Sequence, residues 1–221
     1  MKKATLICFN GIDGSGKTTI STSFKSTLEK LNISCKYYWC GWRGFESWLF
    51  KPAISIIKRI YKIRSSSSGS NKISRLNRKI PAFSYFAIFD YILRVLPNLL
   101  LSLYRYEIVI TDRYIYDVIV GFSVFNKKNE KFVFKTLTYL FPKPDIIFLI
   151  EVPDNIAFSR KDDVPSIEYL TKQKVIYSNC LKGLTKKVID GTKNKDEILN
   201  MVVSEVANYS CERSGKIWVK F

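Results

Sequence analysis

The chain has 221 residues, of which 47% are hydrophobic and 25% charged, so a substantial core is available and general disorder is excluded. Lysine and arginine total 36 against 19 acidic residues, and the resulting net charge of +17 favours acidic partners such as nucleotides, nucleic acid, anionic lipid or charged glycan. Histidine is absent, which excludes imidazole general-base catalysis and histidine-bound zinc. Five cysteines without a C-x-x-C pair indicate reduced thiols, and we expect a cytoplasmic location.

Short β-branched runs alternate with longer helical stretches, a pattern typical of a parallel sheet with helices on both faces. The expected strands cover residues 4–9, 35–39, 107–111, 145–151 and 187–190. The expected helices cover residues 17–31, 48–63, 74–104, 131–140, 167–181 and 195–208. With no sign of a second core, we expect one α/β domain over residues 1–221, with a flexible serine-rich loop at 65–71.

The third expected helix contains a strongly apolar run over residues 83–104. Asp90, Arg94 and Pro97 interrupt this run, so a buried helix is a better interpretation than a transmembrane segment. We expect Pro97 to end or kink the helix, because proline has no N–H to donate and its ring clashes with the preceding turn.

A glycine-rich motif follows the first expected strand. Residues 11–18 read GIDGSGKT and match G-x-x-x-x-G-K-[ST] between a strand and a helix, the context of a P-loop nucleotide-binding site. Backbone N–H groups and the helix N-terminus would hold phosphate oxygens, Lys17 would reach the β- and γ-phosphates of ATP, and the Thr18 hydroxyl would complete a Mg²⁺ shell. The predicted ATP contacts are Gly11, Asp13, Gly14, Ser15, Gly16, Lys17, Thr18 and Thr19.

Asp13 is an unusual residue for a phosphate-binding loop, because a carboxylate repels phosphate. It either points away from the triphosphate towards the acceptor or satisfies its own turn. The variable positions of the loop carry no basic residue, so the arginine that stabilises the transition state must come from elsewhere in the chain or from a partner.

The third expected strand ends in Asp112, Arg113 and Tyr114. Residues at the carboxyl edge of a parallel sheet face the crevice where ligands bind. Asp112 could hold Mg²⁺ or its waters, and Arg113 could bind a phosphate with two hydrogen bonds. The alternative is a surface ion pair that ends the strand.

Together, the G-x-D-G-x-G-K-T-T loop at 11–19, the Asp-Arg-Tyr triplet at 112–114 and the segment 144–153 resemble the thymidylate kinase family. The resemblance implies that Asp13 accepts a hydrogen bond from the acceptor's sugar hydroxyl, that Asp112 organises Mg²⁺, and that Arg113 holds the acceptor phosphate. It also implies a lid at about 154–166 that supplies the missing cation, with Arg160 as first candidate and Lys161 as second, and a homodimer.

The sequence departs from the family mainly on the acceptor side, and most strongly over about 40–84. The family's Arg-Glu-Pro-Gly turn is replaced by Cys-Gly-Trp-Arg-Gly, which leaves Arg43 as the candidate phosphate ligand. Arg94 could replace the usual base-binding arginine, and Phe86 or Phe89 could stack on the base or belong to the core. Asp117 stands where the family usually has serine. The predicted acceptor contacts are Asp13, Arg43, Phe86, Arg94, Arg113 and Tyr114.

These features predict a P-loop kinase that transfers the γ-phosphoryl of Mg-ATP to dTMP. Catalysis is expected from Lys17, Asp112, Arg113 and Arg160, with Thr18 and Asp112 at the metal. Two alternatives stay open: another acceptor, such as a nucleoside, sugar or glycan, or a nucleotide-dependent binding module without a catalytic lid.

A basic segment at 51–79 is not explained by phosphate binding. Residues 47–89 contain no Asp or Glu and nine Lys or Arg, and 49–63 has the pattern of a basic amphipathic helix. The segment is either an ordinary helix with solvated charges or a contact for an extended polyanion, such as an anionic membrane, nucleic acid or charged glycan.

Overall fold

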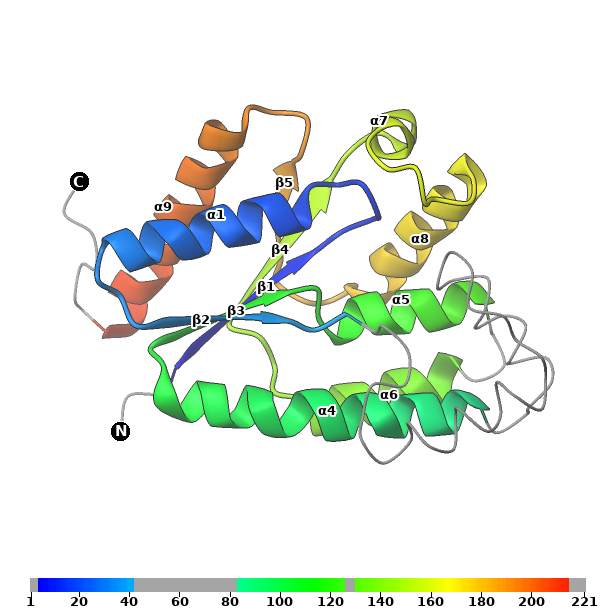
Figure 1. The fold of residues 1–221 in the computed structure, drawn as a ribbon, viewed down its shortest axis with the longest axis horizontal. Coiled ribbons are helices and arrows are strands. Elements are labelled where there is room, and N and C mark those ends of the chain that lie inside the picture. Colours follow the sequence, from blue (N-terminus) through cyan, green and yellow to red (C-terminus); the bar gives the residue numbers. More distant parts are fainter. Residues whose placement is uncertain (1–3, 42–82, 126–129, 215–221) are drawn as a thin grey trace.

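The computed structural model describes residues 4–41, 83–125 and 130–214, and its centre is one sheet of five parallel strands (Figure 1). The strands are β1 (Thr5–Asn10), β2 (Cys35–Trp39), β3 (Ile108–Asp112), β4 (Ile146–Glu151) and β5 (Lys187–Asp190). Their order is β2-β3-β1-β4-β5, so the chain switches direction across the sheet at β1. In open parallel sheets the crevice at such a switch point is the usual ligand site, and here the phosphate-binding loop follows β1.

Seven helices in the described residues cover the two faces of the sheet: α1 (Lys17–Lys30), α4 (Phe83–Arg105), α5 (Ile115–Phe125), α6 (Glu130–Leu140), α7 (Asp154–Ser159), α8 (Ile167–Cys180) and α9 (Lys195–Ser214). Alternate residues of β1 point to opposite faces. Ile7 and Phe9 pack under α1 and α9, whereas Leu6 and Cys8 pack against α4, α5, α6 and α8. The predicted parallel sheet with helices on both faces is therefore confirmed, and every predicted strand lies within one residue of its observed ends.

Two helices were not predicted from the sequence. Helix α5 is so rich in Ile, Val and Phe that no polar face marks it as a helix. It packs between α6 and α8 with Ile119 fully buried, so tertiary burial decides its conformation. Helix α7 has only six residues, too few to show a helical period, and it lies within the expected lid.

Helix α4 continues past Pro97 to Arg105, so Pro97 does not end the helix, and the expected kink stays a prediction. Proline removes one backbone hydrogen bond and loosens the preceding turn. There the carbonyl oxygen of Arg94 accepts hydrogen bonds from the side chains of Asn98 (2.8 Å) and Tyr38 (3.4 Å). Both side chains satisfy the Arg94 carbonyl in the turn before the proline, and the core contacts of the helix continue on both sides of Pro97 through Val95 and Leu99.

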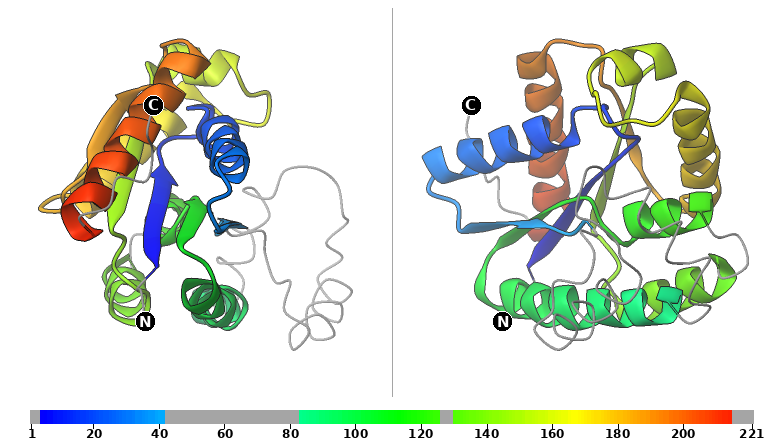
Figure 2. Two further views of the ribbon diagram at one scale, coloured as in Figure 1. Left: turned by 90° about the vertical axis from the view of Figure 1, so that its left-hand side faces the viewer. Right: turned by 45° about the vertical axis from the view of Figure 1, so that its right-hand side comes forward.

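Helix α4 is also the one described helix long and apolar enough to cross a membrane by length and composition. One of its faces is buried in the core, as predicted, through Ala87, Tyr91, Val95 and Leu99. It runs next to α6 on the same side of the sheet (Figure 2), where the rings of Tyr85 and Phe132 lie 4.9 Å apart between centroids.

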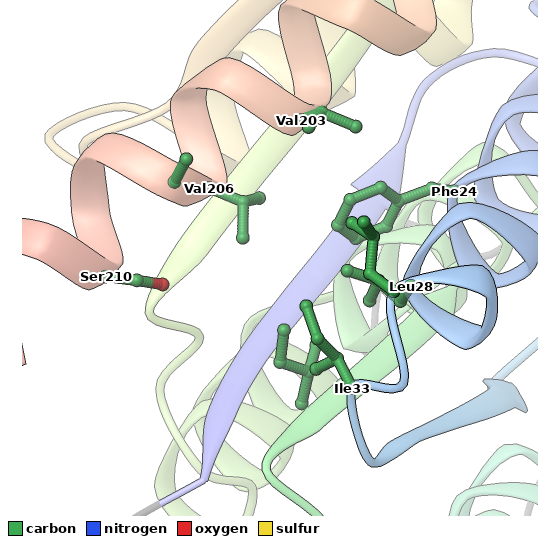
Figure 3. A pocket seen from close by; sticks show the side chains of 9 residues that line it. Phe24, Leu28, Ile33, Val203, Val206 and Ser210 are labelled. Atoms are coloured by element: carbon green, nitrogen blue, oxygen red, sulfur yellow. The ribbon is translucent and has the colours of Figure 1, made fainter. Parts of the chain in front are cut away.

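A shallow groove separates α1 from α9 at the amino edge of the sheet, opposite the end that carries the phosphate-binding loop (Figure 3). Its walls are almost entirely apolar, with Ser210 as the one polar side chain among the residues that line it. The groove therefore offers packing surface rather than convergent polar groups for a ligand. The lining residues are Phe24, Leu28, Leu31, Ile33, Ile108, Val203, Val206, Ala207 and Ser210.

Several sequence predictions lie outside the described residues. These are the helix at 48–63, the loop at 65–71, the basic segment 51–79, Arg43, and the part of the 74–104 helix before Phe83.

Candidate active site

The phosphate-binding loop, residues 11–18, connects β1 to α1 at the carboxyl edge of the sheet. Gly11, Gly14 and Gly16 have φ values of 148°, 83° and 92°, which L side chains rarely adopt. A Cβ atom on Gly11 would collide with the carbonyl of Ile150 in β4, and one on Gly14 would collide with the carbonyl of Ala157 in α7. The glycines therefore allow the loop both its curvature and its close contact with the start of the expected lid.

Lys17 is the first residue of α1, and its side chain is buried, with 4% of the residue exposed. Its Nζ donates hydrogen bonds to the carbonyl oxygens of Gly11 (2.6 Å) and Ile12 (2.7 Å). Burial and the nearby Arg113 lower the pKa of Lys17 to about 8. The ammonium is thus held inside the loop, where the phosphates of a nucleotide would replace backbone carbonyls as its partners.

Asp112 ends β3, is fully buried and faces the start of α1. Its Oδ2 accepts hydrogen bonds from Thr18 Oγ1 (2.7 Å) and from the Tyr37 hydroxyl (2.8 Å), and its Oδ1 is buried without a hydrogen-bond partner. Burial and Asp112 itself raise the pKa of Tyr37, so Tyr37 stays a hydroxyl donor.

These oxygens fit Mg²⁺. Among the described residues no three His, Cys, Asp or Glu side chains gather to hold a metal by themselves. Kinase Mg²⁺ needs fewer protein ligands, because it is bound through one or two carboxylates together with substrate phosphates and water. A serine or threonine hydroxyl and an unpartnered carboxylate oxygen beside a phosphate-binding loop match that requirement.

A second group, which we call the Asp13 cluster, consists of Asp13, Arg113, Asp117, Lys161 and Gln173. Arg113 has a φ of 66° and follows β3, from which its guanidinium reaches Asp13 Oδ1 through Nη2 (2.8 Å) and Asp117 Oδ1 through Nη1 (3.3 Å). Lys161 Nζ lies 3.8 Å from Asp13 Oδ1 and 3.1 Å from Asp163. The cluster thus joins the phosphate-binding loop to the end of β3 and to the segment after α7.

Gln173 was not predicted as a site residue. Its side-chain amide forms a pair of hydrogen bonds with Asp13, accepting from the backbone N–H (3.2 Å) and donating to Oδ2 (3.2 Å), and it also donates to the Tyr169 hydroxyl (3.1 Å). It is buried on the same stripe of α8 as Leu170 and Tyr177. The feature of the sequence that could have identified Gln173 as a site residue is a glutamine on the otherwise apolar, buried side of a helix.

The carboxylates of the Asp13 cluster are held in different charge environments. Burial opposes ionisation of Asp13, but Arg113, Lys17 and Lys161 outweigh it and keep the pKa of Asp13 well below its usual range. Burial raises the pKa of Asp117 despite the opposing effect of Lys17 and Arg113. Arg113 itself is stabilised as a cation, since Asp117 and Asp13 outweigh the burial that would lower its pKa.

The two basic residues of the expected lid have different partners. Arg160, the residue that follows α7, donates from Nη1 to the carbonyl of Gly191 (3.0 Å), and a Cβ on Gly191 would touch the Ser15 carbonyl of the phosphate-binding loop. Lys161 points instead to Asp13. The structure therefore brings the second candidate, Lys161, into the cluster, whereas Arg160 lies beside the loop that follows β5.

Tyr114, Arg94 and Phe86, the remaining predicted acceptor residues in the described part of the chain, lie outside the Asp13 cluster. Tyr114, a predicted acceptor contact, is fully buried in the core, where its hydroxyl donates to the Pro142 carbonyl (2.6 Å). Its ring packs on Tyr116 and Phe141. Arg94 donates from Nη2 to the Gly41 carbonyl just beyond β2 (3.2 Å), and Phe86 is half exposed on α4.

A phosphate-binding loop at the switch point of a five-stranded parallel sheet, with a buried lysine and a carboxylate on the neighbouring strand, defines a P-loop kinase. No protein-family model matches the chain. Three relatives do. The chain is 30% identical over 206 residues to the probable thymidylate kinase 1 of Saccharolobus solfataricus, covering 90% of this chain and 94% of the relative.

The match extends to bacterial and eukaryotic proteins. The thymidylate kinase of Leptospira borgpetersenii is 30% identical over 205 residues, covering 90% of this chain and 91% of the relative. The thymidylate kinase of Plasmodium falciparum is 27% identical over 215 residues, covering 96% of this chain and 93% of the relative. The chain belongs to the thymidylate kinase family.

Proposed function

We propose that the protein transfers the γ-phosphoryl group of ATP to dTMP, giving dTDP and ADP. The observation that carries the proposal is the ion pair between Asp13 and Arg113 at 2.8 Å. It lies at the edge of the phosphate-binding loop, where an acceptor would sit opposite the γ-phosphate. The relatives named above as thymidylate kinases support dTMP as that acceptor.

The donor side would be formed by the phosphate-binding loop. Backbone N–H groups of residues 11–18, the hydroxyl of Ser15 and the ammonium of Lys17 would bind the triphosphate. Ser15 Oγ is buried and has no hydrogen-bond partner, which is consistent with this role. Thr18 and Asp112 would hold Mg²⁺, which when bound neutralises charge on the β- and γ-phosphates.

On the acceptor side, Arg113 would bind the acceptor phosphate with charge-assisted hydrogen bonds. Asp13 would then accept a hydrogen bond from the sugar hydroxyl, and Lys161 would neutralise charge that develops during transfer. Arg94 and Phe86 would contact the base. Because the acceptor already carries an ionised phosphate, little proton abstraction is required, and positioning with charge stabilisation accounts for most of the catalysis.

A transfer assay with radiolabelled ATP and a panel of nucleoside monophosphates, nucleosides and sugar phosphates tests the proposal. We expect label in dTDP, abolished in a Lys17→Ala control. If dTMP stays inert at millimolar concentration while another acceptor is labelled, the acceptor assignment fails and the kinase assignment stands. If ATP binds and no acceptor is labelled, the chain is a nucleotide-dependent binding module.

We further propose a homodimer in the cytoplasm. The exposed apolar side chains Phe89, Leu93 and Leu100 on α4 support a self-association surface, and five free cysteines support a reducing compartment. Sedimentation velocity at micromolar concentration tests the dimer. A sedimentation coefficient for a 25.6 kDa particle at all concentrations would reject it.

A further inference from the structure

Arg113 is held between two carboxylates that differ in exposure. Nη2 faces Asp13, whose side chain is 16% exposed, and Nη1 faces Asp117, whose side chain is only 4% exposed. The Arg113 side chain is 25% exposed. The guanidinium therefore has a buried side fixed by Asp117 and a more accessible side that currently pairs with Asp13.

Asp117 is a buried carboxylate whose polar neighbours are Arg113 and the Tyr177 hydroxyl of α8. Asp117 lies in the first turn of α5, where its N–H donates to the Tyr114 carbonyl (3.0 Å) and the helix dipole favours a negative charge. A small polar side chain such as serine would serve the helix end as well. Instead, a carboxylate is buried there between Arg113 and the Tyr177 hydroxyl of α8, and its burial destabilises the fold unless these two groups compensate the charge.

We propose that Asp117 is a positioning residue that holds Arg113 from its buried side while Asp13 exchanges places with the phosphate of the acceptor. This inference rests on the proposed function. On acceptor binding, Nη2 leaves Asp13 and donates to the phosphate, and Asp13 becomes available to the acceptor's sugar hydroxyl. Asp117 keeps the guanidinium in place through this exchange.

The exchange also selects the acceptor. A phosphate dianion can replace the Asp13 carboxylate on Arg113, because both are anionic acceptors of charge-assisted hydrogen bonds. A neutral hydroxyl cannot replace a carboxylate there without leaving a buried cation poorly paired. The pair of carboxylates therefore favours an acceptor that carries a phosphate over the corresponding nucleoside.

A positioning role for Asp117 predicts a change in phosphate affinity opposite to the change that its charge alone would cause. Removing a negative charge next to Arg113 would by itself strengthen phosphate binding. If Asp117 positions Arg113, its loss weakens phosphate binding instead. We expect Asp117→Asn to lower affinity for dTMP and kcat/KM by about 10-fold, while affinity for thymidine changes less than about 2-fold.

A double-mutant cycle tests this. Wild type, Asp117→Asn, Arg113→Lys and the double variant are titrated with dTMP and thymidine by calorimetry, and turnover of dTMP is measured separately. We expect Asp117→Asn to have no further effect in the Arg113→Lys background, because its action passes through the guanidinium. Asp196→Asn, a first-turn carboxylate of the exposed start of α9, is the matched control and should leave both readouts unchanged.

Every result decides the inference. Tighter dTMP binding in Asp117→Asn, or equal effects in both backgrounds, overturns it and leaves Asp117 as a helix-end residue. Asp117→Ser, which retains a polar helix end, replaces Asp117→Asn if the latter unfolds at the assay temperature. If wild type turns over dTMP and the effects of the two substitutions on dTMP binding are additive, the proposed function stands and this inference fails.

If the effects of the two substitutions on dTMP binding are coupled but no variant turns over dTMP, this inference stands and dTMP kinase activity is rejected. Wild type that binds neither ligand rejects both.

Discussion

The phosphate-binding loop and the Asp13 cluster meet at one residue, Asp13, yet they are assembled in different ways. The loop comes from eight consecutive residues, and its shape depends on three glycines with positive φ. The cluster joins side chains that are 100 residues apart in the pair of Arg113 with Asp13 and 160 apart in the pair of Gln173 with Asp13. A local motif can hold a constant ligand such as a triphosphate, whereas a cluster from distant elements can change with the acceptor.

The two regions also differ in how their charges are satisfied. In the loop, the buried Lys17 donates to neutral carbonyl groups and stays available to phosphate. In the cluster, the cation Arg113 is already paired with carboxylates. A donor nucleotide would therefore fill a prepared site, whereas an acceptor would have to replace an existing ion pair. The predictions below test this difference.

The largest effect is expected at Lys17, the one buried cation of the loop. Lys17→Ala should reduce kcat by about 10²-fold or more, because it removes a contact to the transferring phosphoryl group worth ~3 kcal/mol or more. Circular dichroism should show an intact fold. Turnover close to wild type would show that the loop does not prepare a phosphate site in the way the structure indicates.

The same lysine should give stability an unusual pH dependence. Its pKa is about 8 in the folded protein and 10.5 for an ordinary lysine, so between these values the unfolded chain binds more protons and stability rises with pH. In urea unfolding without nucleotide, the free energy of unfolding of wild type should rise by up to about 3 kcal/mol more than that of Lys17→Met between pH 8 and 10.5. Parallel pH profiles for the two proteins would contradict burial of a charged Lys17.

A smaller effect, confined to the acceptor, is expected at Arg113. Arg113→Ala should raise KM for dTMP and lower kcat, together by about 30-fold in kcat/KM, because one charge-assisted contact contributes about 2 kcal/mol. KM for ATP should change little, as the loop keeps its own contacts. An equal rise in both KM values would show that the two regions act as one.

The smallest effects should distinguish the two basic residues of the proposed lid. Because Lys161 faces Asp13 and Arg160 faces the Gly191 carbonyl, Lys161→Ala should lower kcat by about 10-fold, whereas Arg160→Ala should mainly weaken ATP binding by a few fold. Initial rates at varied ATP and dTMP measure both. If Arg160→Ala instead gives the larger loss of kcat, the lid rearranges on closure and the original expectation for Arg160 is right.

The prediction from sequence succeeded where contacts are local or periodic. Strands β1, β3 and β4 carry long buried apolar runs, and β2 and β5 carry shorter apolar runs. The loop motif fixes both its own backbone and the start of α1 at Lys17. The same reasoning placed Asp112 beside Thr18, because the ends of neighbouring parallel strands meet at one edge.

Tertiary packing decided the rest. Tyr114 follows a functional motif but lies in the core, because Pro142 offers its hydroxyl a buried acceptor and α5 turns its ring inward. Gln173 lies in the site because α8 packs against α5 and brings a buried stripe to Asp13, a contact that no spacing in the sequence encodes. The amino-acid sequence alone determined the fold and the nucleotide loop. Which distant charges pair around Asp13 was decided by helix packing, because an ion pair in a protein interior depends on where each side chain is buried and not on its position along the chain.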